Sequence, residues 1–215
     1  MGWTNLFESK PPSLATRVAS MTLDRLEAGG EQLRGKPEQA DAVFALAIMT
    51  GAGHFVTQCL PSLRPLLGKA NSDTAAFEAL AFNLFALRAA YPKVKQREEV
   101  LVDEGFRTGG LVCLEIANAR FSAHCSSVFF PRVFEYRNRA KKDGIQGAVR
   151  HFTEILFKCR GAKLPVLNYG ATTELYNVEI GLASVGVMIF ATTMPSGIAR
   201  SLKIYIDDAD LLHTM

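Results

Sequence analysis

One histidine and one glutamate of this chain, three residues apart, have side chains and a spacing that could bind a metal ion. His151 and Glu154 would share one face of a helix, and Glu115 and His124 could approach them from a preceding helix. A carboxylate-bridged dimetal centre in a helix bundle needs Glu-x-x-His pairs on two helices. Here the order is reversed and the second pair is missing from the sequence, so we predict no metal site.

The cysteines do not form an evident nucleophile–base pair. They are Cys59, Cys113, Cys125 and Cys159. Each lies among apolar residues of a predicted helix, which is typical of reduced, buried and unreactive thiols in a cytosolic protein. His124 is adjacent to one of them, and neighbours in a helix point to different faces. A cysteine–histidine pair assembled from distant segments stays open as an alternative.

Glycine-containing motifs do not indicate a cofactor. Gly51-Ala-Gly53 continues to Val56 where a dinucleotide fingerprint requires glycine, and no strand is predicted before it. The sequence also has no Gly-Lys-Ser/Thr phosphate loop and no Gly-x-Ser-x-Gly nucleophile elbow. We therefore expect no cofactor and no catalytic residue, and we favour a protein that is not an enzyme.

Cations and aromatic residues alternate in segment 129–142. Its candidate ligands for a polyanion or an acidic partner are Arg132, Arg137, Arg139, Lys141 and Lys142. Cations replace the counterions of phosphates, and aromatic rings stack on unpaired bases, so the segment could bind nucleic acid. The same pattern arises where an amphipathic helix buries its aromatic residues and keeps its cations in water. The net charge of the whole chain, +3, is modest and does not separate the two interpretations.

Residues 180–199 carry no charged side chain, and such a run could just cross a bilayer. Pro195 is expected to end or kink a helix at about Met194, which would leave a length more typical of a core helix. We therefore favour a helix buried within the protein. A membrane helix, and a helix covered only by a partner subunit, are the alternatives.

Helical signals extend along the chain. Ser13 is a predicted N-cap. Residues 40–48 follow an amphipathic helical pattern, which Gly51-Ala-Gly53 is expected to interrupt, and residues 72–91 are apolar nearly all round, as in the centre of a bundle. Further helices are expected over 92–103, 108–130 with an end or bend near Pro131, and 144–160. We predict an all-α bundle of about six to nine helices, in one domain spanning 1–215, with a buried apolar C-terminal helix and a short extended tail. Residues 1–12 and 204–215 are the expected extended termini.

These expectations favour a cytoplasmic interaction protein, such as an adaptor, a regulator or a subunit of an assembly. Apolar residues on several helices suggest that some of this surface meets a second copy or another protein, and a symmetric homodimer is the commonest solution. Two alternatives remain. One is a nucleic-acid-binding regulator that uses segment 129–142, and the other is an enzyme or carrier with a small apolar ligand among phenylalanine-rich helices.

Overall fold

The chain folds into helices, as its composition and periodicity predict. The computed structural model describes residues 12–33, 36, 40–67, 72–118, 124–158 and 169–208, with the backbone alone for 33, 66–67, 97, 118, 124–126, 158, 169–180 and 208. In chain order the elements are α1 (Leu14–Ala19), α2 (Leu23–Leu33), α3 (Ala40–His54), the π-helical turn η2 (Phe55–Cys59), α4 (Leu60–Leu67), α5 (Ser72–Ala90), α6 (Gln96–Asn118), α7 (His124–Lys158) and α8 (Tyr169–Asp208). The all-α prediction is confirmed, and these residues include no strand.

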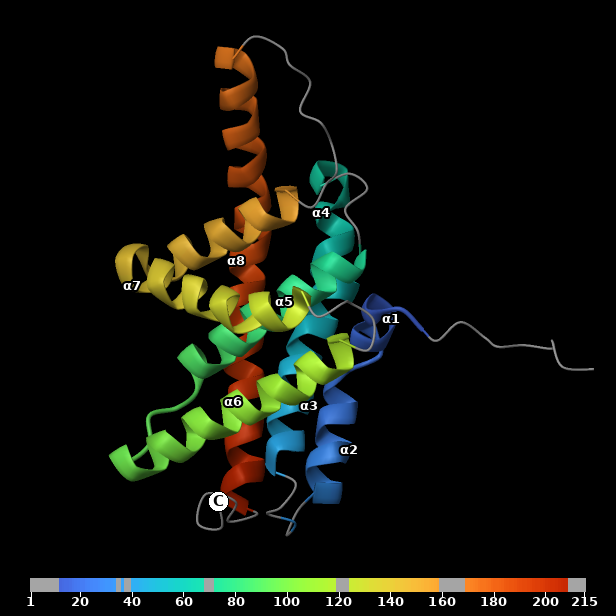
Figure 1. Cartoon of the computed structure of the whole chain (residues 1–215), viewed down its shortest axis with the longest axis vertical. Helices are drawn as coiled ribbons and strands as arrows, with labels where there is room; N and C mark the ends of the chain where they lie inside the picture. Colours follow the sequence, from blue (N-terminus) through green and yellow to red (C-terminus); the bar gives the residue numbers. More distant parts are fainter. Residues whose placement is uncertain are drawn as a thin grey trace, which may run out of the picture.

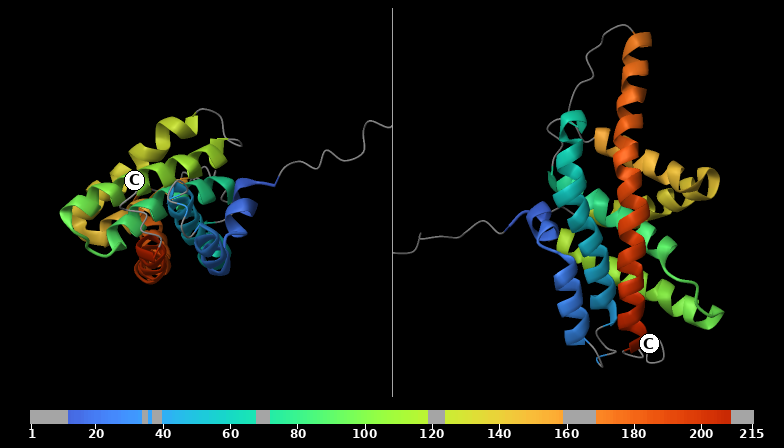
Figure 2. Two further views of the ribbon diagram at one scale, coloured as in Figure 1. Left: turned by 90° about the horizontal axis from the view of Figure 1, so that it is seen from below. Right: turned by 180° about the vertical axis from the view of Figure 1, so that it is seen from behind.

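The helices form two layers. Helices α2, α3 and α8 run along the long axis of the molecule on one side, and α5, α6 and α7 cross them obliquely on the other (Figures 1 and 2). Helix α3 lies between α2 and α8 and packs against α5 and α6 of the second layer. The core between the layers is therefore formed by helices that are distant in sequence.

Helix α5 is the central helix, as its apolar sequence predicts. Every residue from Ala75 to Leu87 is buried, including the polar Glu78 and Asn83. Asn83 Nδ2 donates a hydrogen bond to the carbonyl of Ala79, one turn earlier in the same helix, at 2.9 Å. The amide nitrogen is thus satisfied locally, whereas Asn83 Oδ1 accepts no hydrogen bond from the described residues. Glu78 takes its partners from another helix.

Helices α3 and α6 approach closely because α6 carries glycines at their crossing. An added Cβ at Gly109 would lie 2.6 Å from Phe44 Cβ and 2.9 Å from the backbone nitrogen of Ala45. Gly51 and Gly53 lie within α3. The expected interruption of the helix at these glycines is therefore wrong. A glycine inside a helix costs stability, but here it allows backbones to pack at short range.

Helix α7 consists of two limbs that meet at Asp143 and Gly144. Gly144 has a φ of 69°, in the left-handed region that favours glycine, so the chain turns sharply there (Figure 1). An end or bend was expected near Pro131; the end is wrong, because Pro131 lies inside the first limb. Burial of Phe129 and Tyr136 on either side offsets the missing backbone hydrogen bond.

Helix α8 is a continuous apolar C-terminal helix of 40 residues. The expected end near Pro195 is wrong, since Pro195 is buried inside the helix and α8 continues beyond it. Residues 204–208, predicted as the start of an extended tail, also belong to α8, where Leu202 and Ile206 are buried. The rest of that tail and residues 1–11 lie outside the described part of the chain.

Candidate functional site

The five cations predicted to bind a polyanion do not share one surface of α7. Tyr136 is fully buried and marks the side of the first limb that faces the core. Arg132 and Arg137 lie on either side of it. Arg139, Lys141 and Lys142 are exposed in the last turn before the break. Arg137 is exposed as well, whereas Arg132 is held by carboxylates. The structure therefore divides the predicted set into one internal cation and four external ones.

Glu78 of α5 lies at one end of a chain of polar side chains buried against α7. The Tyr136 hydroxyl donates a hydrogen bond to Glu78 Oε2 at 3.1 Å, and Arg132 Nε lies 3.2 Å from the same oxygen. The arginine contact is an ion pair without hydrogen-bond alignment. Glu78 is 4% exposed, so these two contacts replace most of the water that a carboxylate normally has.

Glu135 connects that ion pair to the second limb of α7. Arg132 Nη1 donates to Glu135 Oε2 at 2.7 Å, and His151 Nε2 lies 3.1 Å from this oxygen. The side chains of Glu78, Tyr136, Arg132, Glu135 and His151 thus join α5 to both limbs. We call them the buried polar chain after its buried end at Glu78 and Tyr136; the Glu135 side chain is exposed. These contacts hold the two limbs of α7 against the central helix α5.

The environment moves the pKa values of the two carboxyls in opposite directions. Burial raises the pKa of Glu78, although the Arg132 guanidinium and the Tyr136 hydroxyl act against it. The pKa of Glu135 is lowered: its partial burial acts to raise it, but the hydrogen bond to His151 and the pairing with Arg132 outweigh that cost. The two carboxyls therefore titrate in different pH windows.

We expect the Glu78→Gln variant to lose one pH-dependent contribution to stability. Because the pKa of Glu78 is raised in the folded protein, its contribution is present below the ordinary value of 4.5 and is lost as pH rises through the folded pKa. The free energy of unfolding of the wild type should fall relative to that of Glu78→Gln as pH rises above that value. Urea titrations over a pH series measure this difference, and parallel curves for the two proteins would contradict it.

The predicted absence of a metal site stays a prediction, and the structure shows how its candidate ligands are placed. His151 Nδ1 lies 3.8 Å from Glu154 Oε2, too far for a hydrogen bond, while Glu115 is exposed on α6. The side chain of His124 lies outside the described residues. Among the described side chains, no group of three or more potential ligands is arranged to hold a metal ion.

The two described thiols are poor nucleophiles. Burial raises the pKa of Cys59 to about 11 and that of Cys113 to about 12. Both are free, and Cys113 is fully buried. Since the thiolate is the reactive form, neither is suited to nucleophilic catalysis. The side chains of Cys125 and Cys159 lie outside the described residues.

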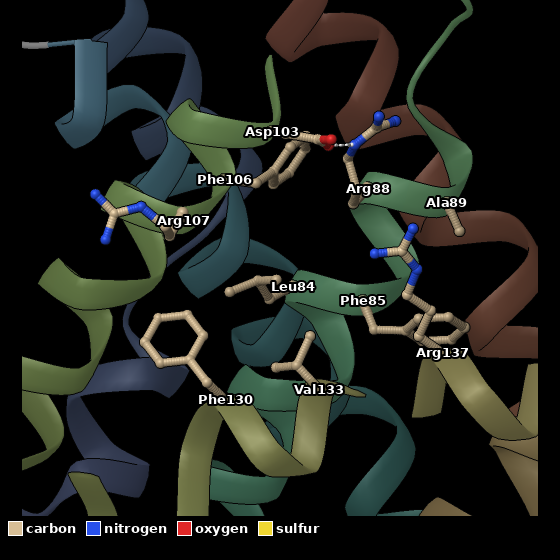
Figure 3. A pocket seen from close by; sticks show the side chains of 10 residues that line it. All are labelled: Leu84, Phe85, Arg88, Ala89, Asp103, Phe106, Arg107, Phe130, Val133 and Arg137. Carbon is tan, nitrogen blue, oxygen red and sulfur yellow. Dashed lines mark hydrogen bonds and ion pairs between the residues drawn. The ribbon is translucent and has the colours of Figure 1, made fainter. Parts of the chain in front are cut away.

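A pocket of about 460 Å³ opens between α5, α6 and α7. Figure 3 shows its apolar side chains, among them Leu84, Phe106 and Phe130, which come from three different helices. Arg88 and Arg137 lie on one side of it and Arg107 on the other (Figure 3). We call this the arginine pocket. A pocket of this size is within the range of small-molecule sites in proteins.

The three arginines differ in how their charge is compensated. Arg88 pairs with Asp103 through Nε, and its Nη2 lies 3.2 Å from Glu99 Oε1. Arg107 pairs with Glu104 on the exposed face of α6. Arg137 has no ion-pair partner in the described part of the chain. The sequence indicated Arg137 through its basic segment, but it did not indicate that α5 and α6 would add two more guanidinium groups.

The outer face of α8 exposes a row of large apolar side chains. Leu182, Val185 and Ile189 are 60%, 61% and 62% exposed, and their spacing places them along one side of the helix. We call them the α8 stripe. The inner face, with Ala183, Val187 and other residues, is buried. The apolar C-terminal helix is therefore confirmed, but only one of its faces is covered by the fold.

Two stretches are long and apolar enough to cross a membrane by length and composition, Ala40–Pro65 and Gly181–Asp207. In the most apolar window of the first stretch 67% of the residues are buried, as expected for a core helix. The corresponding value for the second stretch is 39%, so the fold leaves much of its apolar surface uncovered.

Comparisons of this chain with models of known protein families, with curated proteins and with solved structures give no match.

Proposed function

We propose that this protein acts by association, and that the α8 stripe is the surface through which it binds a second copy of the chain. The single observation that carries this proposal is the row of three large apolar side chains, each about three-fifths exposed, on one face of the uncharged part of α8, residues 180–199. Contiguous apolar surface of this kind marks interaction sites in soluble proteins. We place the protein in the cytoplasm, which the free thiols Cys59 and Cys113 support.

The chemistry of α8 suits a symmetric contact. Residues 180–199 carry no charge, so two copies of this face would meet without repulsion. The stripe continues through Thr192 and Ser196 with alternating spacings of three and four residues, the repeat by which two helices pack along a shared seam. Gly181, which has open space around it, would let the second helix approach closely. The first turns of α8 project beyond the other helices (Figure 1).

The test is light scattering on a sizing column without detergent, with the ultraviolet spectrum recorded across the peak. We expect the wild type to be a dimer and Val185→Glu to be a monomer, with the dimer dissociation constant raised by at least about 100-fold because a carboxylate would be buried in the contact. Val100→Glu is the matched control, since it places the same charge at an apolar side chain of α6 that is 68% exposed. It should remain a dimer.

The outcomes separate the proposal from its alternatives. A wild type that stays monomeric at every concentration, or a dimer that survives Val185→Glu, would contradict self-association through the stripe. A protein that leaves solution unless detergent is added would instead favour a membrane as the partner of this face.

Binding of a polyanion is the second candidate function. The observation that supports it is the exposure of Arg137, Arg139, Lys141 and Lys142 in the first limb of α7. The sizing-column experiment also tests this second function. Bound nucleic acid would dominate the ultraviolet spectrum of the protein peak and would dissociate at high salt. Arg132 would not contribute, because it is engaged with Glu78 and Glu135.

A further inference from the structure

We propose that the arginine pocket is a binding site for a small amphipathic anion, an organic carboxylate carried on an apolar body of one or two rings. The site lies on α5, α6 and the first limb of α7, so it is independent of the α8 stripe and of association through it.

The inner part of the pocket determines the apolar half of the ligand. Leu84 and Phe85 come from α5, Phe106 from α6, and Phe130 and Val133 from α7. Aromatic side chains from separate helices favour a flat apolar group placed between them. A volume of about 460 Å³ accommodates such a group together with a polar head.

The side of the pocket that carries Arg88 and Arg137 determines the charge of the ligand. Asp103 compensates Arg88 and is the only carboxylate among the described residues that line the pocket, so the lining stays positive after it is counted. Arg137 forms no ion pair within the described residues, and its five N–H donors are free to bind an anion. A guanidinium group binds a carboxylate through two parallel hydrogen bonds.

The positions of the three arginines make Arg137 the main residue that would bind the carboxylate of the ligand. Arg107 lies across the pocket and pairs with Glu104, and Arg88 is held by Asp103 and Glu99. Figure 3 shows Arg137 reaching from α7 past the ring of Phe85 toward the side on which Arg88 lies. A carboxylate bound by Arg137 would therefore also lie near the positive charge of Arg88, with its apolar body directed toward Leu84 and Phe130.

The test is isothermal titration of the full chain with naphthalene-2-carboxylate and with its neutral isostere, naphthalene-2-methanol. We expect the carboxylate to bind with a dissociation constant below about 1 mM and the alcohol to bind more weakly. The Arg137→Gln variant should lose about tenfold in affinity for the carboxylate at low salt and should no longer prefer it over the alcohol. Arg139→Gln removes the same charge from an exposed position two residues away, and it should bind like the wild type.

Three results would overturn the proposal. One is the absence of binding to the folded wild type up to about 1 mM carboxylate. The second is equal affinity for the carboxylate and the alcohol, which would indicate a purely apolar contact. The third is equal loss of affinity in Arg137→Gln and Arg139→Gln, which would indicate a diffuse effect of net charge. Circular dichroism establishes that both variants are folded, and an exposed side chain is replaced in each.

Discussion

Replacing Glu78 by leucine is expected to lower the free energy of unfolding by about 2–4 kcal/mol. The substitution leaves the fully buried Tyr136 hydroxyl without its acceptor and removes one of the two carboxylates that hold Arg132. An unsatisfied buried hydroxyl and a cation deprived of a partner are both costly, and leucine adds little burial in return. Urea unfolding followed by circular dichroism measures the loss.

A double-mutant cycle shows whether the loss comes from the buried polar chain. Tyr136→Phe alone should cost about 1 kcal/mol. The double variant Glu78→Leu/Tyr136→Phe should be more stable than the sum of the single losses predicts, by about 1 kcal/mol or more, because no hydroxyl is then left unsatisfied. Glu115→Leu, which changes an exposed carboxylate of α6, is the matched control and should leave stability nearly unchanged. Strict additivity in the cycle would show that the Tyr136–Glu78 hydrogen bond does not stabilise the fold.

The second large effect is expected at the crossing of α3 and α6. Gly109→Ala should destabilise the protein by about 2 kcal/mol, although alanine is the better helix former by up to about 1 kcal/mol. The new Cβ would lie 2.9 Å from the backbone nitrogen of Ala45 and 3.0 Å from the backbone carbon of Phe44. Backbone atoms cannot move aside by rotation about a side-chain bond, so the two helices would have to separate.

Gly197→Ala is the control for this prediction, and its effect should have the opposite sign. An added Cβ at Gly197, which is exposed on α8, meets no atom within 4 Å. Only helix propensity then changes, and we expect the free energy of unfolding to rise by about 0.5–1 kcal/mol. Thermal unfolding of both variants measures the two shifts. A stable Gly109→Ala variant would mean that the α3–α6 contact adjusts easily, and equal effects of both variants would contradict the argument from close approach.

Much of the site could not be predicted because its residues belong to different segments. Glu78 was noticeable in the sequence as an acid in an otherwise apolar helix, but its partners Arg132 and Tyr136 lie more than fifty positions later. In the sequence, His151 was considered as a partner of Glu154, yet its nearest carboxylate is Glu135 on the other limb of α7. Spacing along one helix carries no information about which side chains another helix brings near.

The elements themselves were predictable where their signals are local. The apolar sequence of 72–91 indicated a central helix, and the Ser13 hydroxyl caps α1 by accepting a hydrogen bond from the backbone nitrogen of Thr16. The errors occurred at Gly51, Pro131 and Pro195, where a local helix breaker lies inside a helix. Burial against neighbouring helices supplies more free energy than these residues cost, and that burial exists only after the chain has folded.

The amino-acid sequence by itself determined that this protein is all-α, that α5 lies at its centre and that its C-terminal helix is apolar, because helix formation and amphipathicity depend on residues within a few turns of one another. Only the tertiary structure decided which cations stay free, which carboxylate is buried and which face of α8 remains uncovered. Arg132 and Arg137 are five positions apart in one basic segment, but the first pairs with Glu78 of α5 and the second faces a pocket. Those differences arise from the packing of α7 against α5 and α6, and the free energy of such contacts depends on distances in space.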